Sequence, residues 1–177
     1  MNIEELLQIL WTTNNLKLKF RIISILAAYI MSCDSNVEVI VKCKRLYDQI
    51  HVLLSEGPSL KCAIVFNFLS ALLYFDADVG TRKKSLALYA RNMVKASGCL
   101  AIICNYFARS MMHQETWVAL CRCLAEACRG SNASQSFCSH LIPTCLKKCK
   151  QGNLEAICVL QNLLHHHKKN INLFLDC

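Results

Sequence analysis

Strand signals and chain breakers are both scarce in this sequence. It contains only two Pro and five Gly in 177 residues, and no segment keeps a strict apolar-polar alternation between turn dipeptides. The apolar runs are long and rich in Leu and Ala instead. This pattern argues against β-structure and leaves little room for disorder.

Charged residues are also few. They make up 18% of the chain, whereas hydrophobic residues make up 54%, so we expect helices that are buried on more than one side. No apolar run reaches the roughly 18 to 20 uncharged residues that a membrane span needs. The segment Met1–Thr12 carries acidic residues where a secretory signal would carry basic ones. We therefore expect a cytoplasmic protein without a membrane segment.

Motifs for catalysis and cofactor binding are missing as well. The sequence has no Gly-rich phosphate-binding loop, and no paired carboxylates stand out for acid-base chemistry. No Cys lies in a context that activates thiols, apart from Cys99, which follows Gly98. We therefore expect a protein that is not an enzyme, with no catalytic residues and no cofactor.

Cysteine is the exception to this scarcity, because the chain holds thirteen. Without a secretory signal we expect a reducing compartment, in which most thiols are small buried hydrophobes. Cys121 and Cys123 point about 200° apart on a helix, and the consecutive His165, His166 and His167 cannot converge on one ion. We predict no metal site, and a solvated helix end for the three histidines.

The five glycines separate apolar stretches with helical periodicity, as expected where helix ends need a residue free to adopt left-handed geometry. Two of the helices, 16–32 and 59–75, lack a polar face and must be sandwiched between neighbours. Alternation of amphipathic and wholly apolar helices is typical of a helical solenoid. The predicted helices are 3–12, 16–32, 36–54, 59–75, 81–96, 99–112, 115–129, 134–140, 143–150, 153–167 and 170–176.

Residues 134–164 resemble one armadillo repeat. A short first helix precedes Ile142-Pro143, which starts a second helix, and Gly152 turns into a third helix that contains Asn162. His140 departs from the pattern, because it lies near the position of a family glycine. The second half of the pattern recurs earlier, where Gly57 precedes Asn67 by the same ten residues that separate Gly152 from Asn162.

The resemblance implies an all-α fold, an armadillo/HEAT-like right-handed helical solenoid of about four irregular repeats. Weaker equivalents of the third-helix Asn are Ala28 and Glu126. Residues 1–177 would form a single helical-repeat domain, and because Cys177 directly follows the apolar stretch 171–175, we expect a fragment of a longer array. The tract QNLLHHHKKNINLFL is also similar to the C-terminal repeats of the rotatin family of centriole proteins, which implies a centrosomal assembly scaffold.

The function that this resemblance implies is a protein-interaction scaffold. Third helices would line a concave surface along which a helix or extended peptide of a partner protein lies. In armadillo proteins the third-helix Asn commonly hydrogen-bonds the backbone of a bound peptide. This points to Asn67 and Asn162, with Arg122 and Glu126 nearby. The alternative for each Asn is a buried structural hydrogen bond.

Clustered lysines suggest the charge of the partner. Lys147, Lys148 and Lys150 could meet an acidic protein segment, or could form part of a basic ridge that binds nucleic acid, which is our alternative function. Aromatic residues do not interleave with the basic clusters, which disfavours nucleic acid. A solvated surface is the third possibility for these lysines, and both a monomer and end-to-end stacking of the repeats remain open.

Overall fold

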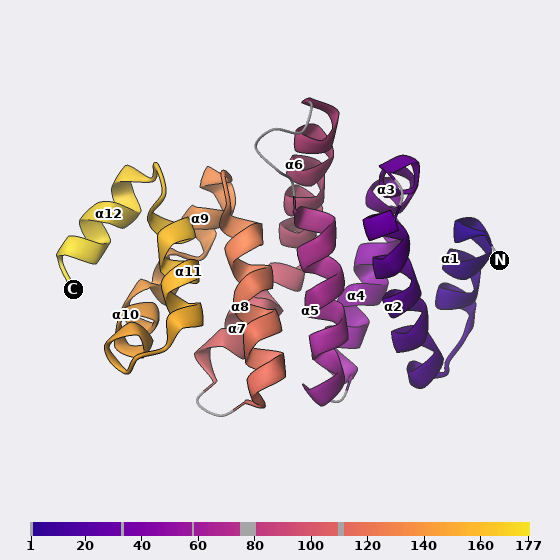
Figure 1. Ribbon diagram of the computed structural model, residues 1–177, viewed down its shortest axis with the longest axis horizontal. Coiled ribbons are helices and arrows are strands. Elements are labelled where there is room, and N and C mark those ends of the chain that lie inside the picture. The colour runs from indigo at the N-terminus through magenta and orange to yellow at the C-terminus, as the bar shows by residue number, and fades with distance from the viewer. Residues whose placement is uncertain (1, 33, 58, 75–80, 110–111) are drawn as a thin grey trace.

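The computed structural model describes residues 2–32, 34–57, 59–74, 81–109 and 112–177, and within these ranges every regular element is a helix (Figure 1). The predicted all-α class is therefore confirmed. Most predicted helices agree with the observed bounds to within about one turn. The bounds are α1 Ile3–Thr12, α2 Leu16–Ser32, α3 Asp34–Lys42, α4 Lys44–Glu56, α5 Ser59–Leu73, α6 Thr81–Ala96, α7 Cys99–Ala108, α8 Gln114–Cys128, α9 Asn132–Phe137, the 3-10 helix Ser139–Leu141, α10 Ile142–Lys150, α11 Leu154–Leu164 and α12 Lys168–Leu175.

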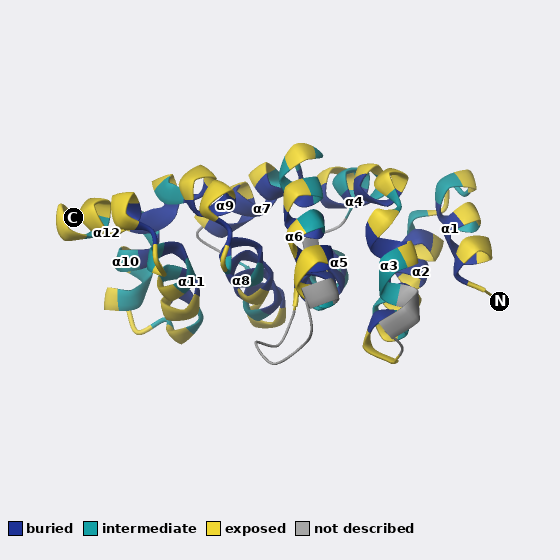
Figure 2. Ribbon diagram, turned by 90° about the horizontal axis from the view of Figure 1, so that it is seen from above, coloured by how far each residue is buried: buried dark blue, intermediate teal, exposed yellow. Residues whose placement is uncertain are grey.

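Four helices, spaced three apart along the chain from α2 to α11, lie in one row across the molecule. The row helices α2, α5, α8 and α11 lie side by side in Figure 1, and the most extensive helix packing in the described chain joins α5 to α8, α8 to α11 and α2 to α5. Figure 2, seen from above, shows α4, α7 and α9 in a second layer behind the row. The molecule is therefore elongated, with α1 at one end and α12 at the other (Figure 1).

The apolar character of α5 follows from its place in the row. Its side chains are buried on most sides, and its packing partners include the flanking row helices α2 and α8 and the helices α4 and α6. Phe66 and Phe68 are both fully buried although they point about 160° apart on the helix. The prediction that this helix is sandwiched between neighbours is confirmed.

The predicted single helix over residues 36–54 is wrong, because the chain forms two helices that meet at Cys43. Cys43 has an extended backbone (φ −74°, ψ 91°) and is the N-cap of α4. The hydroxyl of Tyr47 donates a buried hydrogen bond of 2.8 Å to the carbonyl oxygen of Val41, near the end of α3. Apolar residues keep the same spacing on both sides of the break, so periodicity alone could not reveal it.

The predicted left-handed geometry is confirmed at three glycines. Gly152 has φ 82°, Gly98 has φ 80° and Gly130 has φ 64°. At Gly152 the amide of the glycine donates to the carbonyl of Cys149, and the amide of Asn153 donates to that of Lys148. This pair of bonds is the Schellman motif, which satisfies the last carbonyls of α10 before the chain turns into α11.

Gly57 has a different role from the one predicted. Its φ is −74° and its ψ is 153°, an extended conformation open to any residue. A Cβ atom at this position would lie 2.6 Å from Cζ of Phe20 and 2.3 Å from the carbonyl oxygen of Leu53. Glycine is therefore required for close packing of α2 against the end of α4. Gly80 lies outside the described residues.

Buried amides join the C-terminal helices. Nε2 of Gln135 on α9 donates to the carbonyl oxygens of Asn162 (2.7 Å) and His165 (2.8 Å) at the end of α11. Nδ2 of Asn170 on α12 donates to the carbonyl oxygens of Leu163 (2.8 Å) and Gln135 (3.1 Å). Both side chains are almost completely buried. This C-terminal amide network satisfies helix-end carbonyls that would otherwise lack partners.

Candidate protein-binding surface

Three predicted site residues occupy the same position on neighbouring row helices. The ninth residue is Asn67 in α5, Arg122 in α8 and Asn162 in α11, counted from the first residue of each helix. Asn67 and Arg122 are exposed and Asn162 is half-buried. These three helices pack side by side, α5 against α8 and α8 against α11.

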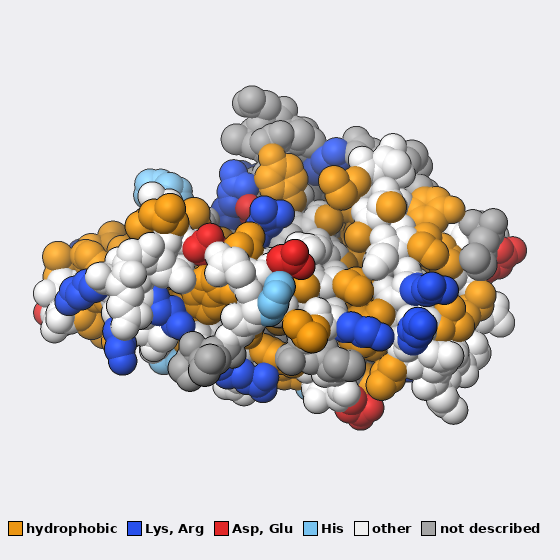
Figure 3. Space-filling view, turned by 60° about the horizontal axis from the view of Figure 1, so that its bottom comes forward, with side chains coloured by type: hydrophobic (Ala, Val, Ile, Leu, Met, Phe, Trp, Pro, Cys, Tyr) orange, Lys and Arg blue, Asp and Glu red, His pale blue; other side chains and the backbone are white. Residues whose placement is uncertain are grey.

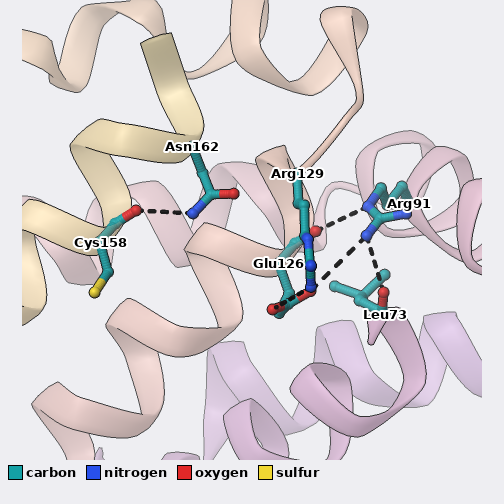
Figure 4. Close-up of polar contacts among 6 residues, drawn as sticks. All are labelled: Leu73, Arg91, Glu126, Arg129, Cys158 and Asn162. Atoms are coloured by element: carbon teal, nitrogen blue, oxygen red, sulfur yellow. Dashed lines mark hydrogen bonds and ion pairs between the residues drawn. The ribbon is translucent and has the colours of Figure 1, made fainter. Parts of the chain in front are cut away.

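The polar groups of these three residues are largely free. Within the described ranges, neither Asn67 nor Arg122 has a side-chain hydrogen bond or an ion pair. Nδ2 of Asn162 donates to the carbonyl oxygen of Cys158 one turn earlier, at 2.9 Å, and its Oδ1 stays available as an acceptor (Figure 4). The structure thus favours exposed amides over buried structural hydrogen bonds at Asn67.

Glu126 lies one helical turn beyond Arg122 and is already engaged. Its Oε1 is 3.4 Å from Nη1 of Arg129, and its Oε2 is 4.0 Å from Nη2 of Arg91 (Figure 4). Its side chain is only 17% exposed. The carboxylate therefore helps to hold α8 against α6 and is less accessible to a partner than Arg122.

Arg91 is a buried residue that links α6 to α5 and α8, and it was not predicted from the sequence. Its side chain is 2% exposed, and it donates from Nε to the carbonyl oxygen of Glu126 (2.8 Å) and from Nη2 to that of Leu73 (2.9 Å). Burial lowers its pKa to about 10, while the nearby Glu126 carboxylate acts in the opposite direction. The signal in the sequence was its place on the buried stripe of α6 with Ala87 and Val94, at four- and three-residue spacing.

The three predicted lysines do not lie on the row, because all three belong to α10. Nζ of Lys148 lies 4.5 Å from the ring centroid of Trp117 and 5.8 Å from that of Phe107. Lys147 and Lys150 are exposed and border an open hollow near the end of α12. Consecutive helical residues point about 100° apart, so Lys148 is separated from the other two and the cluster is not one surface.

The row surface mixes apolar and basic side chains. Figure 3 shows the lower edge of the molecule together with part of the row, where hydrophobic side chains are interspersed with Lys and Arg, and acidic groups are fewer. Among the large apolar residues exposed on the row helices, Met31 is 82%, Leu154 71% and Leu60 68% exposed.

Most of the thiols are buried. Cys121, Cys123 and Cys145 are almost inaccessible, as predicted for small core hydrophobes, and burial raises the pKa of each thiol. Within the described ranges, no group of three or more His, Cys, Asp or Glu side chains is arranged to hold a metal ion. Because their pKa values are raised, the thiols of Cys121, Cys123 and Cys145 are poor nucleophiles.

The histidine run was only partly predicted. His165 and His166 are exposed, as expected of a helix end, but the prediction is wrong for His167, which is buried. Its Nδ1 accepts a hydrogen bond from the amide of Asn170 at 3.2 Å, and its Nε2 is 2.9 Å from Oγ of Ser136. His167 is therefore the N-cap of α12, and its ring also contacts α9.

Comparisons with known proteins found no match among family models, curated proteins or solved structures. In the described ranges, no single helix is long and apolar enough to cross a membrane. The bent pair Lys83–Ala96 and Cys99–Ala108, which meets at 75°, passes that test by length and composition alone.

Proposed function

We propose that this chain is a helical-repeat protein of armadillo or HEAT character that binds another protein along the row surface, without catalysis. The observation that supports it most strongly is a polar residue at the same position of three adjacent row helices, Asn67, Arg122 and Asn162, of which the first two have free side chains and the third keeps its Oδ1 available. The regular order of two helices before each of α5, α8 and α11 supports a solenoid.

The dimensions of the row suit an extended peptide. Packed helices lie about 8–10 Å apart, and an extended chain rises about 3.3 Å per residue. A peptide that crosses the row therefore advances about three residues per helix. Asn67 and Asn162 could then hydrogen-bond its backbone, while Arg122 between them would favour an acidic side chain.

The lysines of α10 offer little to nucleic acid. Lys148 lies against Trp117 and away from Lys147 and Lys150, so these three do not form one ridge of adjacent phosphate contacts. Nucleic-acid binding would also weaken steeply with salt. A titration with DNA and RNA at low salt would detect it.

The cellular setting rests on resemblance alone. The similarity of residues 161–175 to rotatin-family repeats leads us to propose a cytoplasmic protein that acts at the centrosome as part of a longer array. Imaging of a tagged chain beside a centriole marker tests this. A diffuse signal throughout the cell cycle would contradict it.

Peptide selection followed by calorimetry tests the binding surface. Random 16-residue peptides displayed on phage are selected against the chain, and the best synthetic peptide is titrated into wild type and the double variant Asn67→Ala, Asn162→Ala. Loss of two hydrogen bonds, at about 0.5–1.5 kcal/mol each, should weaken binding by roughly 5- to 150-fold.

The matched control removes an exposed asparagine elsewhere. Asn105 lies on α7, outside the row, and Asn105→Ala should leave the peptide affinity unchanged. A double variant that stays folded and binds with wild-type affinity would defeat the proposal.

A further inference from the structure

The N-cap of α12 is a ring nitrogen of His167. The backbone amide of Asn170 donates to Nδ1 of His167 at 3.2 Å, and His167 is only 8% exposed. The usual N-cap residues are Ser, Thr, Asp and Asn, whose side-chain oxygens accept this bond at any pH near neutrality. Histidine is the side chain that ordinarily changes its charge between about pH 5 and pH 8. The N-cap of α12 therefore belongs to the one residue type that can be switched by a small change in pH.

The hydrogen bonds of this ring determine its tautomer. A backbone amide can only donate, so Nδ1 of His167 must carry a lone pair, and the hydrogen of the neutral ring must be on Nε2. Nε2 then donates to Oγ of Ser136 on α9, at 2.9 Å. The neutral ring thus joins the start of α12 to α9, and only the neutral ring can make both bonds.

Protonation of His167 would remove the cap. A hydrogen on Nδ1 would face the amide hydrogen of Asn170, so two donors would meet where a hydrogen bond had been. The charged ring would also lie at the positive end of the helix dipole of α12. Lys168 and Lys169 follow it directly and are both exposed. Each of these contacts destabilises the capped conformation once the ring is charged.

The helices that pack against α12 are α9, α10 and α11, and they supply no carboxylate close to His167. Helix α9 has no charged side chain, and the one acidic residue on α10 and α11 is Glu155, at the opposite end of α11 from His167. Asp176 lies beyond the far end of α12, about 13 Å from His167 along the helix axis. The other ionisable side chains on α10, α11, α12 and the turn before α12 are thiols or bases, namely Cys145, Lys147, Lys148, Cys149, Lys150, Cys158, His165, His166, Lys168 and Lys169.

Asn170 connects the cap to the C-terminal amide network. The residue whose backbone amide bonds His167 also donates from Nδ2 to the carbonyl oxygens of Leu163 and Gln135. Loss of the cap would free the first turn of α12 and, with it, the side chain that joins α12 to α9 and α11. A single protonation is therefore coupled to the attachment of the whole helix.

We propose that His167 makes the attachment of α12 sensitive to pH. The neutral ring holds α12 against α9, and the protonated ring releases it as the pH falls from about 7.5 to 5.5, while α5 and α8 stay packed. This regulation uses groups other than Asn67, Arg122 and Asn162, so it does not depend on the proposed peptide binding.

Hydrogen exchange at pH 7.5 and pH 5.5 tests the proposal, with exchange times scaled to the intrinsic rate at each pH. In the wild type, the protection of the α12 amides should fall by roughly tenfold or more at the lower pH, because the helix loses its cap. The protection of the α5 and α8 amides should change by less than about threefold, because these helices do not contain the switch.

Two single substitutions separate His167 from its neighbours. His167→Asn supplies a cap that does not titrate, so the protection of α12 should stay within about threefold between the two pH values. His166→Asn removes an adjacent exposed imidazole and is the matched control, which should keep the wild-type fall. Circular dichroism establishes that both variants are folded.

NMR of the isotopically labelled wild type tests the same geometry without a substitution. Two-bond 1H–15N spectra at pH 7.5 should place the ring hydrogen of His167 on Nε2. Four results would overturn the proposal. They are wild-type protection of α12 that does not change with pH, an equal fall in α5 and α8, a fall that persists in folded His167→Asn, and a ring hydrogen on Nδ1.

Discussion

Replacement of Arg91 by methionine would test how strongly one buried cation holds the row together. The guanidinium donates to carbonyl oxygens near the ends of α5 and α8, at 2.9 Å and 2.8 Å, and it lies near the Glu126 carboxylate. Met has a similar length but no donor. Arg91→Met would leave two helix-end carbonyls and a half-buried carboxylate without this partner.

The magnitude follows from those lost partners. Each buried acceptor left without a donor costs about 1–3 kcal/mol, and removal of one partner of a buried ion pair costs about 3–5 kcal/mol in total. We expect urea unfolding to show a loss of about 3–5 kcal/mol for Arg91→Met. Thermal unfolding should show a decrease in Tm of roughly 6–20 °C for a chain of this size.

A matched exposed residue controls for the loss of positive charge. Arg122→Met removes the same group from the solvent-facing side of α8, and its unfolding free energy should stay within about 0.5 kcal/mol of wild type. Arg91→Lys should be intermediate, because an ammonium group keeps the charge but not the planar fork. A loss below about 1 kcal/mol for Arg91→Met would refute the assignment of a structural role to this network.

Three further predictions concern packing and ionisation. Gly57→Ala should lower the unfolding free energy by about 1–3 kcal/mol, because the new methyl group overlaps its neighbours; a neutral result in urea titration would contradict the close approach. Lys148→Met should lower the unfolding free energy by about 0.5–1 kcal/mol, because the ammonium group loses its contact with the indole ring of Trp117. Lys147→Met should lower it by less, and equal losses for the two variants would argue against a stabilising contact with Trp117. Burial raises the pKa of the Cys99 thiol to about 11, so its stabilising effect is complete below pH 9 and is lost as pH rises to 11. Denaturant titrations at pH 8 to 11 should therefore show a smaller decline in unfolding free energy for Cys99→Ala than for wild type. Equal declines would show that ionisation of Cys99 does not contribute to the pH dependence.

Apolar periodicity and glycine position were sufficient to predict where nearly all the helices lie. Both signals report on burial and helix ends, and those are local properties of the chain. The break at Cys43 escaped prediction because no Gly or Pro marks it and because α3 and α4 bury residues at a continuous helical spacing. Its stabilising contact, from Tyr47 to Val41, depends on the fold around it.

For the candidate site, the sequence indicated the positions of residues but not their contacts. Asn67 and Asn162, which the repeat pattern singled out, both lie at the ninth position of a row helix, because a repeated turn and helix specify a repeated position. The pattern could not show that Glu126 pairs with Arg91, since their partnership crosses from α8 to α6. The divergence of Lys148 from Lys147 and Lys150 could have been predicted from the 100° rotation between consecutive helical residues.

The C-terminal amide network has a consequence for how the chain opens. Asn170 on α12 bonds carbonyl oxygens on α11 and α9, and Gln135 on α9 bonds the end of α11. Detachment of α12 alone would therefore expose buried carbonyls on two other helices at once. Residue-by-residue fraying of α12 is therefore disfavoured. The last helices should exchange their amide hydrogens together, as one cooperative unit.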